Sequence, residues 1–332
     1  MSESRVLVAG ASGFAGALAA SLVWRHPRLE LAAATSRGDA GTRLDRLYPR
    51  HRVAVELTEL DLERAAECEA AIVAYPHGAA AELIGDLRRA GLAIVDVSAD
   101  FRLHDLATYE RTYGDHGAPE LLADAVYGLP ELHRDEIADA QLVANPGCYP
   151  TAALLALAPL AEAGLVNDVV ISAASGVSGA GRRGGERLHF VTVDENFSPY
   201  GVDGHRHAPE IVQELRELGA SAPVSFVPHL LPLDQGLLAS CYVGLQRDLG
   251  KEELRSLYEE RYADEPFVEL ARQPPGVRDV RDTNLCRVHV SLDDAGRVLA
   301  FAAIDNLWKG AAGQAIQNLN LMLGLPETEG LK

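Results

Sequence analysis

The sequence has little positive charge, few cysteines and no long apolar run, and each shortage excludes a class of protein. Its 332 residues include 30 Lys and Arg against 48 Asp and Glu, which gives a formal net charge of −18. Phosphate contacts need a basic face, so a chain this acidic is a poor candidate for binding nucleic acid. The four cysteines contain no CxxC pair, which argues against a disulfide framework or a zinc ribbon. They are Cys68, Cys148, Cys241 and Cys286.

Membrane-spanning and secretory segments are also missing. A membrane helix needs about 18 uninterrupted apolar residues, and the longest apolar run, around 152–161, is broken by Pro159. Residues 1–5 are not a basic segment leading into a long apolar core, so we expect no signal peptide. The sequence therefore predicts a cytoplasmic protein with a small-molecule partner and neither a nucleic-acid nor a membrane partner.

The apolar pattern changes near the middle of the chain, and the length suggests two domains of about 150 residues each. In the first half, short apolar runs alternate with helical patterns, which is typical of a parallel sheet covered on both faces. The expected strands are 5–9, 29–35, 70–74, 93–97 and 141–144, and the expected helices are 15–25 and 79–90. This pattern predicts an α/β fold with a doubly wound Rossmann domain.

Longer loops separate the strand-like pieces of the second half. Apolar runs at 169–174, 237–245 and 285–292 indicate an α+β domain for substrate binding and assembly, and a last helix is expected over 311–323. The predicted domains are residues 1–148 and residues 149–306.

A glycine-rich turn follows the first expected strand, Gly10-Ala11-Ser12-Gly13-Phe14-Ala15-Gly16. Glycines three apart let the backbone turn tightly and approach a pyrophosphate at the N-terminus of the next helix. The spacing is GxxGxxG and not GxGxxG, and such a turn can also be purely structural. The strand–turn–helix context favours a dinucleotide site, with Gly10, Ser12, Gly13, Phe14 and Ala15 as cofactor contacts.

The end of the second expected strand indicates which dinucleotide binds. NAD sites usually place an acid there, whereas this chain has Thr35-Ser36-Arg37. A guanidinium favours the additional 2′-phosphate through charge-assisted hydrogen bonds, although a solvated loop arginine is the alternative. Ser36 and Arg37 therefore predict NADP(H). Pro76-His77-Gly78 and residues 98–102 follow other strands of the same sheet, where ligands also bind, so Pro76 and His77 are further cofactor candidates.

Cys148 is the candidate nucleophile. It lies in Asn145-Pro146-Gly147-Cys148-Tyr149-Pro150-Thr151, at or just before the N-terminus of a helix expected over 152–163. Free N–H groups and the helix dipole favour the thiolate there, and the thiolate is the nucleophilic form. Burial as a small apolar side chain is the alternative, and it fits the other three cysteines. Around Cys148, however, Pro-Gly and Tyr-Pro define a turn that simple packing does not require.

The candidate proton carriers are His205 and His207, in Gly204-His205-Arg206-His207-Ala208-Pro209-Glu210, ahead of a helix that Pro209 would begin. Neutral imidazole serves as a general acid or base, and Arg206 could bind a carboxylate or phosphate. Surface histidines and a metal site with Cys148 are the alternatives. One HxH with a distant cysteine lacks the usual zinc spacings, so no metal is predicted. The small residues at 175–181 allow close approach of a cofactor, or form a flexible loop.

Together these motifs resemble the N-acetyl-γ-glutamyl-phosphate reductase family, a group of the semialdehyde dehydrogenases. The resemblance extends from Val6 to about Gly324. It is carried by residues 10–16, 35–37, 76–78, 98–102, 127–131, 145–151, 175–182, 204–211, 228–230 and 305–314. The chain departs from the family pattern at Phe14, where a tyrosine is usual, and at Gln235, where an arginine normally precedes Gly236.

The resemblance implies reductive dephosphorylation of N-acetyl-γ-glutamyl phosphate by NADPH, in arginine biosynthesis. It makes Cys148 the nucleophile and favours His207 over His205 as the acid and base. Cofactor contacts near the nicotinamide would come from Ser175, Gly176, Ser178, Gly179 and Asn306. Substrate contacts would come from Arg102, Asn145, Tyr200, His205, Arg206 and Glu210. A homodimer or homotetramer built through the second domain is implied, with the helix in residues 307–332 packing back on the first domain.

Other functions stay open at this point. The same chemistry could act on aminoadipate or glutamyl phosphate bound to an acidic carrier protein, for lysine or ornithine biosynthesis. The charge of −18 disfavours such a carrier, although Arg182, Arg183 and Arg187 could form a local basic patch. A catalytically inactive NADPH-binding protein is disfavoured by the joint presence of Cys148 and the two histidines. Aspartate-semialdehyde dehydrogenase lacks the His-Arg-His-x-Pro-Glu segment, and a metal-dependent hydrolase would need bound zinc.

Overall fold

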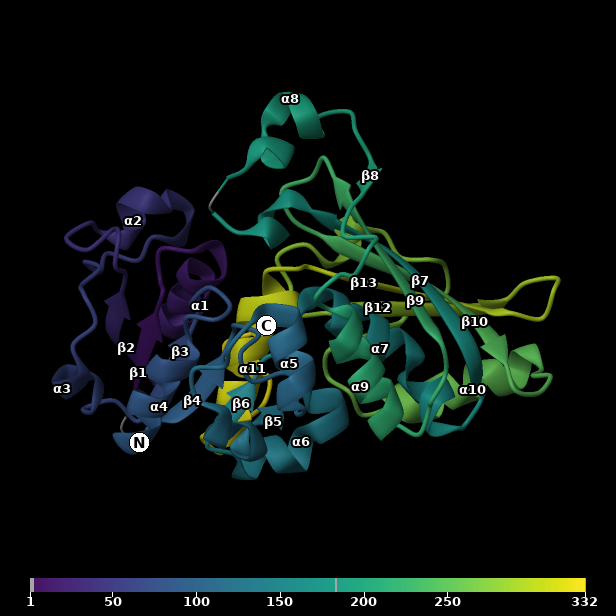
Figure 1. The fold of residues 1–332 in the computed structure, drawn as a ribbon, viewed down its shortest axis with the longest axis horizontal. Coiled ribbons are helices and arrows are strands. Elements are labelled where there is room, and N and C mark those ends of the chain that lie inside the picture. The colour runs from purple at the N-terminus through teal and green to yellow at the C-terminus, as the bar shows by residue number, and fades with distance from the viewer. Residues whose placement is uncertain (1–2, 183, 332) are drawn as a thin grey trace. The chain divides into compact units, whose positions relative to one another are not determined.

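The computed structural model describes residues 3–182 and 184–331, and the chain divides into two compact units (Figure 1). One unit contains the chain up to Pro146 together with the segment from Ala311 onward, and the other is Gly147–Gly310. Arg183, which the carrier alternative invoked, lies outside the described residues. The expected α/β class is confirmed.

A six-stranded parallel sheet forms the centre of the first unit, in the order β2-β1-β3-β4-β6-β5. Its side chains are almost completely buried in β3, β4 and β6, as a sheet covered on both faces requires. The strands are β1 (Ser4–Ala9), β2 (Leu29–Thr35), β3 (Ala70–Val73), β4 (Ala93–Asp96), β5 (Val126–Tyr127) and β6 (Leu142–Ala144).

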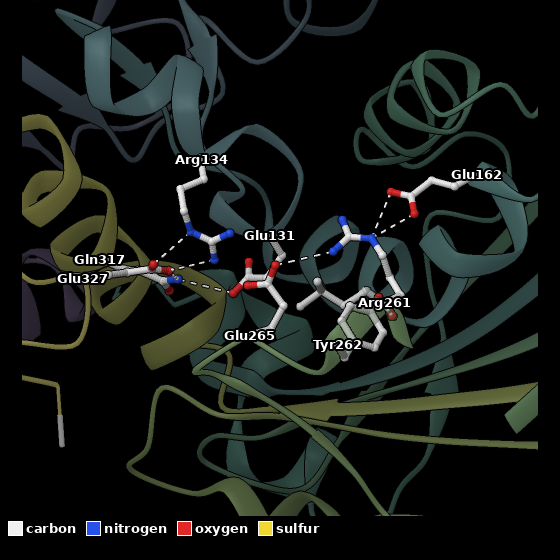
Figure 2. A network of polar contacts seen from close by, with 9 residues as sticks. Glu131, Arg134, Glu162, Arg261, Tyr262, Glu265, Gln317 and Glu327 are labelled. Carbon is white, nitrogen blue, oxygen red and sulfur yellow. Dashed lines mark hydrogen bonds and ion pairs between the residues drawn. The ribbon is translucent and has the colours of Figure 1, made fainter. Parts of the chain in front are cut away.

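Helices flank this sheet, and the last one returns to it from the far end of the chain. They are α1 (Phe14–Arg25), α2 (Leu44–Leu47), α3 (Leu62–Ala65), α4 (Ala81–Arg89), α5 (Leu106–Tyr113), α6 (Pro130–Asp139) and α11 (Gly313–Met322). α11 contacts α1, α6 and β4. Hydrogen bonds hold the segment that follows α11 (Figure 2). Arg134 Nε of α6 and Gln317 Nε2 of α11 both donate to the Glu327 carboxylate, at 2.9 and 2.7 Å.

A seven-stranded mixed sheet forms the second unit, in the order β11-β12-β13-β10-β7-β9-β8. Ile171, Cys241 and Ala300 stand opposite one another across three strands and are buried. The next residues along these strands point to the other face, where Val170 and Tyr242 are 41% and 38% exposed. The strands are β7 (Val166–Gly176), β8 (Ser198–Pro199), β9 (Val224–Leu231), β10 (Leu237–Leu245), β11 (Val268–Leu270), β12 (Cys286–Leu292) and β13 (Val298–Ile304).

The central helix of this unit is α7 (Cys148–Glu162), which contacts β10, β13 and two further helices, α9 (Ala208–Glu217) and α10 (Lys251–Tyr262). It continues through Pro159, whose missing N–H leaves the Leu155 carbonyl without its usual helical donor. The Tyr262 hydroxyl of α10 donates to that carbonyl at 2.5 Å and supplies the absent hydrogen bond.

Shorter elements complete the described chain. A four-residue helix, α8 (Phe190–Val193), lies in the long connection between β7 and β8, and a π-helix, Trp308–Ala312, precedes α11. Among the helices of the described residues, none has both the length and the apolar character that crossing a membrane demands.

Candidate active site

The glycine turn of the first unit is shaped by backbone contacts that leave no room for side chains. Gly10 has φ +84°, and a β-carbon there would collide with the backbone of Ala74, while one at Gly16 would collide with the Gly10 carbonyl. The helix α1 begins at Phe14, and no described side chain caps it at Gly13. The uncapped N–H groups and the bare backbone together form a suitable cradle for a pyrophosphate.

The end of β2 lies directly beside this turn. The hydroxyl oxygens of Ser12 and Ser36 are 2.8 Å apart, and the amide N–H groups of Gly10 and Ala11 donate to the Thr35 carbonyl at 3.1 and 2.9 Å. Arg37 is exposed, and its guanidinium carbon lies 5.5 Å from the centre of the Tyr75 ring. Ser12 and Ser36 are thus in direct contact, and Arg37 has Tyr75 as an aromatic neighbour; the cofactor contacts of all three stay predictions.

A buried carboxylate, Asp100, connects the loops that follow β3 and β4. It accepts hydrogen bonds from the amides of Gly78, Ala80 and Ala81 at 2.6–3.1 Å and from the Tyr109 hydroxyl at 3.1 Å. These bonds explain why α4 begins at Ala81, two residues later than expected. Sequence patterns did not indicate this role, and Asp100 was named only as part of the 98–102 segment.

The neighbouring groups on these loops are also held by internal bonds. His77 Nδ1 accepts from the Ala99 amide at 2.9 Å, next to Pro76. Asp96 is fully buried; desolvation, followed by the nearby Asp100 charge, raises its pKa to about 7. The His77 ring is therefore held against the loop that follows β4, and the cofactor contacts of Pro76 and His77 stay predictions.

Arg102 and Asn145 are buried at the segment that leads to Cys148. The Arg102 guanidinium donates to the carbonyls of Asn145 and Val97, at 2.7 and 2.9 Å. The Asn145 side chain donates to the Ala311 carbonyl at 3.2 Å and accepts from Asn318 at 3.1 Å. These contacts support the backbone of the segment, and the expected substrate contacts of both residues stay predictions.

Cys148 is the first residue of α7, and Gly147 is the N-cap without a side-chain cap. This confirms the expected position at a helix N-terminus. Cys148 is partly exposed, whereas the other three cysteines are buried, and burial raises the pKa of Cys241 to about 12. A β-carbon at Gly310 would lie 2.7 Å from the β-carbon of Cys148, so this glycine leaves the space that the cysteine occupies.

Two side chains at the start of α9 reach the peptide before Cys148. A β-carbon at Gly147 would lie 2.6 Å from Nε2 of His207, so the imidazole packs directly on that glycine. Glu210 is buried, and its carboxylate accepts from the Gly147 amide at 2.8 Å. The histidine and the glutamate, more than fifty residues away in sequence, therefore both contact the residue that precedes Cys148.

His205 lies in an aromatic cage within the same unit. Its ring centre is 5.4–5.7 Å from those of Tyr149, Tyr200 and Phe226, and 4.9 Å from that of His207. Burial, with a smaller contribution from Arg206, lowers its pKa to about 4. His205 Nδ1 accepts from the amide of His207 at 3.1 Å, which leaves the proton on Nε2. His205 is thus a neutral support for His207 at physiological pH.

The cage is closed by a chain of hydroxyl groups. Tyr200 donates to the Tyr149 oxygen, and Tyr149 donates to the His229 carbonyl, both at 3.1 Å. Desolvation raises the pKa of Tyr200 to about 12, so it stays protonated at neutral pH. Sequence analysis assigned no role to Tyr149 or Phe226. Tyr149 lies within the 145–151 motif and Phe226 lies just before the 228–230 motif, and these positions were the only signal of a place near the site.

The loop after β7 packs tightly against residues 233–236. A β-carbon at Gly176 would lie 2.8 Å from the Asp234 carbonyl oxygen, and the Ser178 amide donates to the same oxygen at 3.0 Å. Asn306 accepts from the Gly236 amide at 2.7 Å and donates to the Ser178 hydroxyl at 3.0 Å. Ser175 and Gly179 lie beside these groups, so the predicted nicotinamide contacts form one cluster.

Gln235, where the family pattern has an arginine, is buried behind this cluster. Its side-chain amide donates to Asp282 Oδ1 at 2.7 Å and to Asp305 Oδ2 at 3.0 Å. Burial raises the pKa of Asp305. Arg281 donates to the Gln235 carbonyl at 3.0 Å, so a cation still lies close to this position.

Family comparisons agree with both units. The family described as "Semialdehyde dehydrogenase, NAD binding domain" matches residues 5–140, and "Semialdehyde dehydrogenase, dimerisation domain" matches residues 148–306. An N-acetyl-gamma-glutamyl-phosphate reductase from Alkalilimnicola ehrlichii is 49% identical over 98% of this chain and 96% of its own length. One from Halorhodospira halophila is also 49% identical, over 98% and 97%.

Solved structures with a similar fold are aspartate semialdehyde dehydrogenases. Enzyme II from Vibrio cholerae gives a TM-score of 0.75 at 18% identity, covering 98% of this chain and 99% of that one. The Candida albicans enzyme with NADP gives 0.73 at 16% identity, covering 97% and 99%. At this level of identity the likeness concerns the fold alone.

Proposed function

Since this chain belongs to the N-acetyl-γ-glutamyl-phosphate reductase family of semialdehyde dehydrogenases, we propose that it reduces N-acetyl-γ-glutamyl phosphate to N-acetylglutamate 5-semialdehyde with NADPH, releasing phosphate, in arginine biosynthesis. The observation that carries the proposal is the placement of Cys148 at the start of α7, with the His207 imidazole against the preceding glycine. A nucleophile and a proton carrier are the two groups that this chemistry requires of the protein.

Cys148 attacks the carbonyl carbon of the acyl phosphate, and the bond from that carbon to the phosphate oxygen breaks. The product on the enzyme is a thioester, which divides one difficult reduction into two easier steps. The uncapped N-terminus of α7 favours the anionic sulfur and offers N–H groups to the oxyanion that forms during attack.

His207 accepts the proton of the Cys148 thiol as the sulfur attacks. After reduction of the thioester, it returns that proton to the oxyanion of the thiohemiacetal, and it removes the hydroxyl proton again as the carbon–sulfur bond breaks to give the aldehyde and the Cys148 thiolate. His205 stays neutral with its low pKa and holds the His207 backbone through Nδ1. Glu210 holds the Gly147 amide, which supports a positioning role in place of a direct substrate contact.

The cradle at Gly10 and Gly16 fits a dinucleotide, because the two glycines permit the tight turn and the N–H groups at the start of α1 have no cap from a described side chain. When bound, the nicotinamide supplies the hydride that reduces the thioester. Ser12, Gly13, Phe14 and Ala15 would hold the phosphates, and Ser36 and Arg37 would bind the 2′-phosphate that distinguishes NADP from NAD. On the first unit, Pro76 and His77 are further candidate contacts; on the second, the cluster of Ser175, Gly176, Ser178, Gly179 and Asn306 would contact the nicotinamide.

Arg206 is the group we assign to the acidic end of the substrate. It lies between the two histidines and is exposed, whereas Arg102 and Asn145 are buried and bonded to neighbouring chain segments. Tyr200 borders the same histidine pair through its contact with His205. A guanidinium in that position can form two parallel hydrogen bonds with the substrate carboxylate.

We assign the exposed face of the seven-stranded sheet to the contact between subunits of a homodimer or homotetramer. We also propose that the enzyme is cytoplasmic. Val170 and Tyr242 are neighbours on that face and are exposed apolar side chains. The family description of this unit as a dimerisation domain supports the assignment. Light scattering on the wild type and a Tyr242→Asp variant tests it, since a charge there should shift the protein toward monomer.

The reverse reaction provides the direct test of activity. Purified protein is given N-acetylglutamate 5-semialdehyde and NADP, with and without phosphate, and formation of NADPH is followed. Turnover should require phosphate and should be faster with NADP than with NAD. In the forward direction, free N-acetyl-γ-glutamyl phosphate should be reduced faster than a carrier-bound acyl phosphate. Absence of phosphate-dependent turnover, or preference for the carrier-bound substrate, would contradict the proposal.

A further inference from the structure

A pocket in the first unit lies at the opposite end of α1 from the glycine turn. It has a volume of about 420 Å³ and is lined by Trp24, Arg25, Arg50, His51 and Arg52. Trp24 and Arg25 are the last residues of α1, whereas the glycine turn immediately precedes its first residue. At a rise of about 1.5 Å per residue, the two ends of this helix are about 16 Å apart. The pocket is therefore separate from the pyrophosphate cradle.

The wall of the pocket is held in place by specific hydrogen bonds. The Tyr48 hydroxyl donates to the Ser12 carbonyl at 2.7 Å, and the His51 amide donates to the Tyr48 carbonyl at 3.0 Å. Arg25 Nη2 donates to the His51 carbonyl at 2.8 Å, and His51 is buried. The segment that carries Arg50 and Arg52 is thus fixed to both ends of α1.

The arginines of this pocket have no counter-charge from the residues that line it. None of the five lining residues is acidic, and among the described residues Arg50 and Arg52 have neither an ion pair nor a side-chain hydrogen bond. Two other exposed arginines of the same unit, Arg64 and Arg89, are paired with Asp61 and Asp86. The pocket is therefore locally basic in a protein whose formal net charge is −18.

Arg52 is also held in a conformation that costs free energy. Its φ is +57°, in the left-handed region that residues with a β-carbon rarely adopt. Strain of this kind persists where surrounding structure enforces it, and it occurs preferentially at ligand sites. An unpaired guanidinium maintained in a strained turn indicates that a ligand provides the missing negative charge.

We propose that this pocket binds a nucleoside polyphosphate at a site distinct from that of the dinucleotide. Guanidinium groups bind phosphate oxygens through pairs of charge-assisted hydrogen bonds, and Arg50 and Arg52 are both available for this. Trp24 is 48% exposed and offers an aromatic surface to a base. The volume lies within the range of about 300–1,000 Å³ that small-ligand sites occupy.

The test titrates ADP into protein that is already saturated with NADP, so that the dinucleotide site is blocked. Calorimetry should show one further site, and binding should change the fluorescence of Trp24. Adenosine, which lacks the phosphates, should bind at least tenfold more weakly. The double variant Arg50→Gln/Arg52→Gln should weaken ADP binding at least tenfold, and Trp24→Phe should remove the fluorescence change while keeping calorimetric binding.

The matched control is Arg64→Gln/Arg255→Gln, which changes the net charge equally at two exposed arginines outside the pocket and should bind ADP as the wild type does. The substituted side chains are exposed, and the thermal unfolding midpoint and NADP affinity verify that each variant is folded. The proposal is overturned if NADP-saturated protein binds no ADP, if adenosine binds as tightly, or if the two double variants weaken binding equally.

Discussion

The imidazole of His207 packs on Gly147 so closely that Nε2 lies 2.6 Å from where a β-carbon of residue 147 would be. The residue before Cys148 is thus a glycine because the His207 ring occupies the space of a side chain there. Glu210 binds the amide of the same glycine at 2.8 Å. His207 and Glu210 therefore both hold the backbone at Gly147, directly before Cys148.

Replacing Gly147 with alanine tests this relationship. The new methyl group would force the His207 ring away from its position, and a displacement of about 1 Å can lower turnover about 10²-fold. Kinetics should show a loss in kcat with little change in NADPH affinity. Gly250→Ala is the control, because a β-carbon at Gly250 meets no atom within 4 Å. Equal activities of the two variants would show that the packing is unimportant.

Cys148→Ser tests the covalent step. A serine hydroxyl is far less nucleophilic than a thiolate, so turnover should fall by about 10³-fold or more, as in other enzymes that lose their nucleophile. NADPH binding, measured by fluorescence titration, should be nearly unchanged. Cys68→Ala is a suitable comparison because Cys68 is a buried cysteine of the other unit. Substantial turnover by the serine variant would refute a thioester intermediate.

Arg37→Gln tests the choice of cofactor. Removing charge-assisted hydrogen bonds to the 2′-phosphate, worth about 1.5–3 kcal/mol, should raise the KM for NADP about 10- to 100-fold. The KM for NAD should change little, because NAD has no such phosphate. Arg46→Gln, at an exposed position of α2, should leave both values unchanged. If NAD and NADP are affected alike, Arg37 does not distinguish between them.

The sequence was sufficient for those parts of the fold that repeat a local pattern. The runs predicted at 29–35 and 237–245 are β2 and β10 to the residue, because apolar side chains and polar borders mark both ends. The last helix was expected from Ala311 but begins at Gly313, after a π-helical turn. The two-residue strands β5 and β8 carry too few residues for any periodicity.

The sequence predicted which residue types form the candidate site but not the hydrogen bonds that hold them. Cys148 and His207 were chosen for what thiols and imidazoles do, and local signals placed each at a helix start. The bonds from Glu210 to Gly147 and from Asp100 to the start of α4 join segments 63 and about 20 residues apart. Such pairings depend on tertiary packing, which no local pattern encodes.

His205 should make the protein less stable in acid. Its pKa is about 4 when folded against about 6.5 for an ordinary histidine, so the unfolded chain binds more protons between these values. Stability from this group is complete above pH 6.5 and is lost as the pH falls toward 4. From pH 7 to pH 5 the loss should be about 1–2 kcal/mol.

Urea unfolding of wild type and His205→Asn at both pH values measures this contribution. The asparagine keeps an acceptor for the His207 amide but does not titrate. Asp96, whose raised pKa acts in the opposite direction, is present in both proteins, so only the difference between them matters. The variant should lose about 1–2 kcal/mol less than the wild type between pH 7 and pH 5. Equal losses would mean that His205 titrates normally.

Glu210 distinguishes a positioning role from a substrate contact. Glutamine keeps an oxygen that can accept from the Gly147 amide, so Glu210→Gln should retain kcat within about tenfold. Glu210→Ala leaves that buried donor unpaired and should lower kcat about 10²-fold. Because the bond acts on the nucleophile's backbone, both variants should keep the wild-type KM for the acyl phosphate. The Cys148 alkylation rate provides a substrate-free readout and should fall in the alanine variant alone. A raised KM with unchanged alkylation would instead place the carboxylate on the substrate.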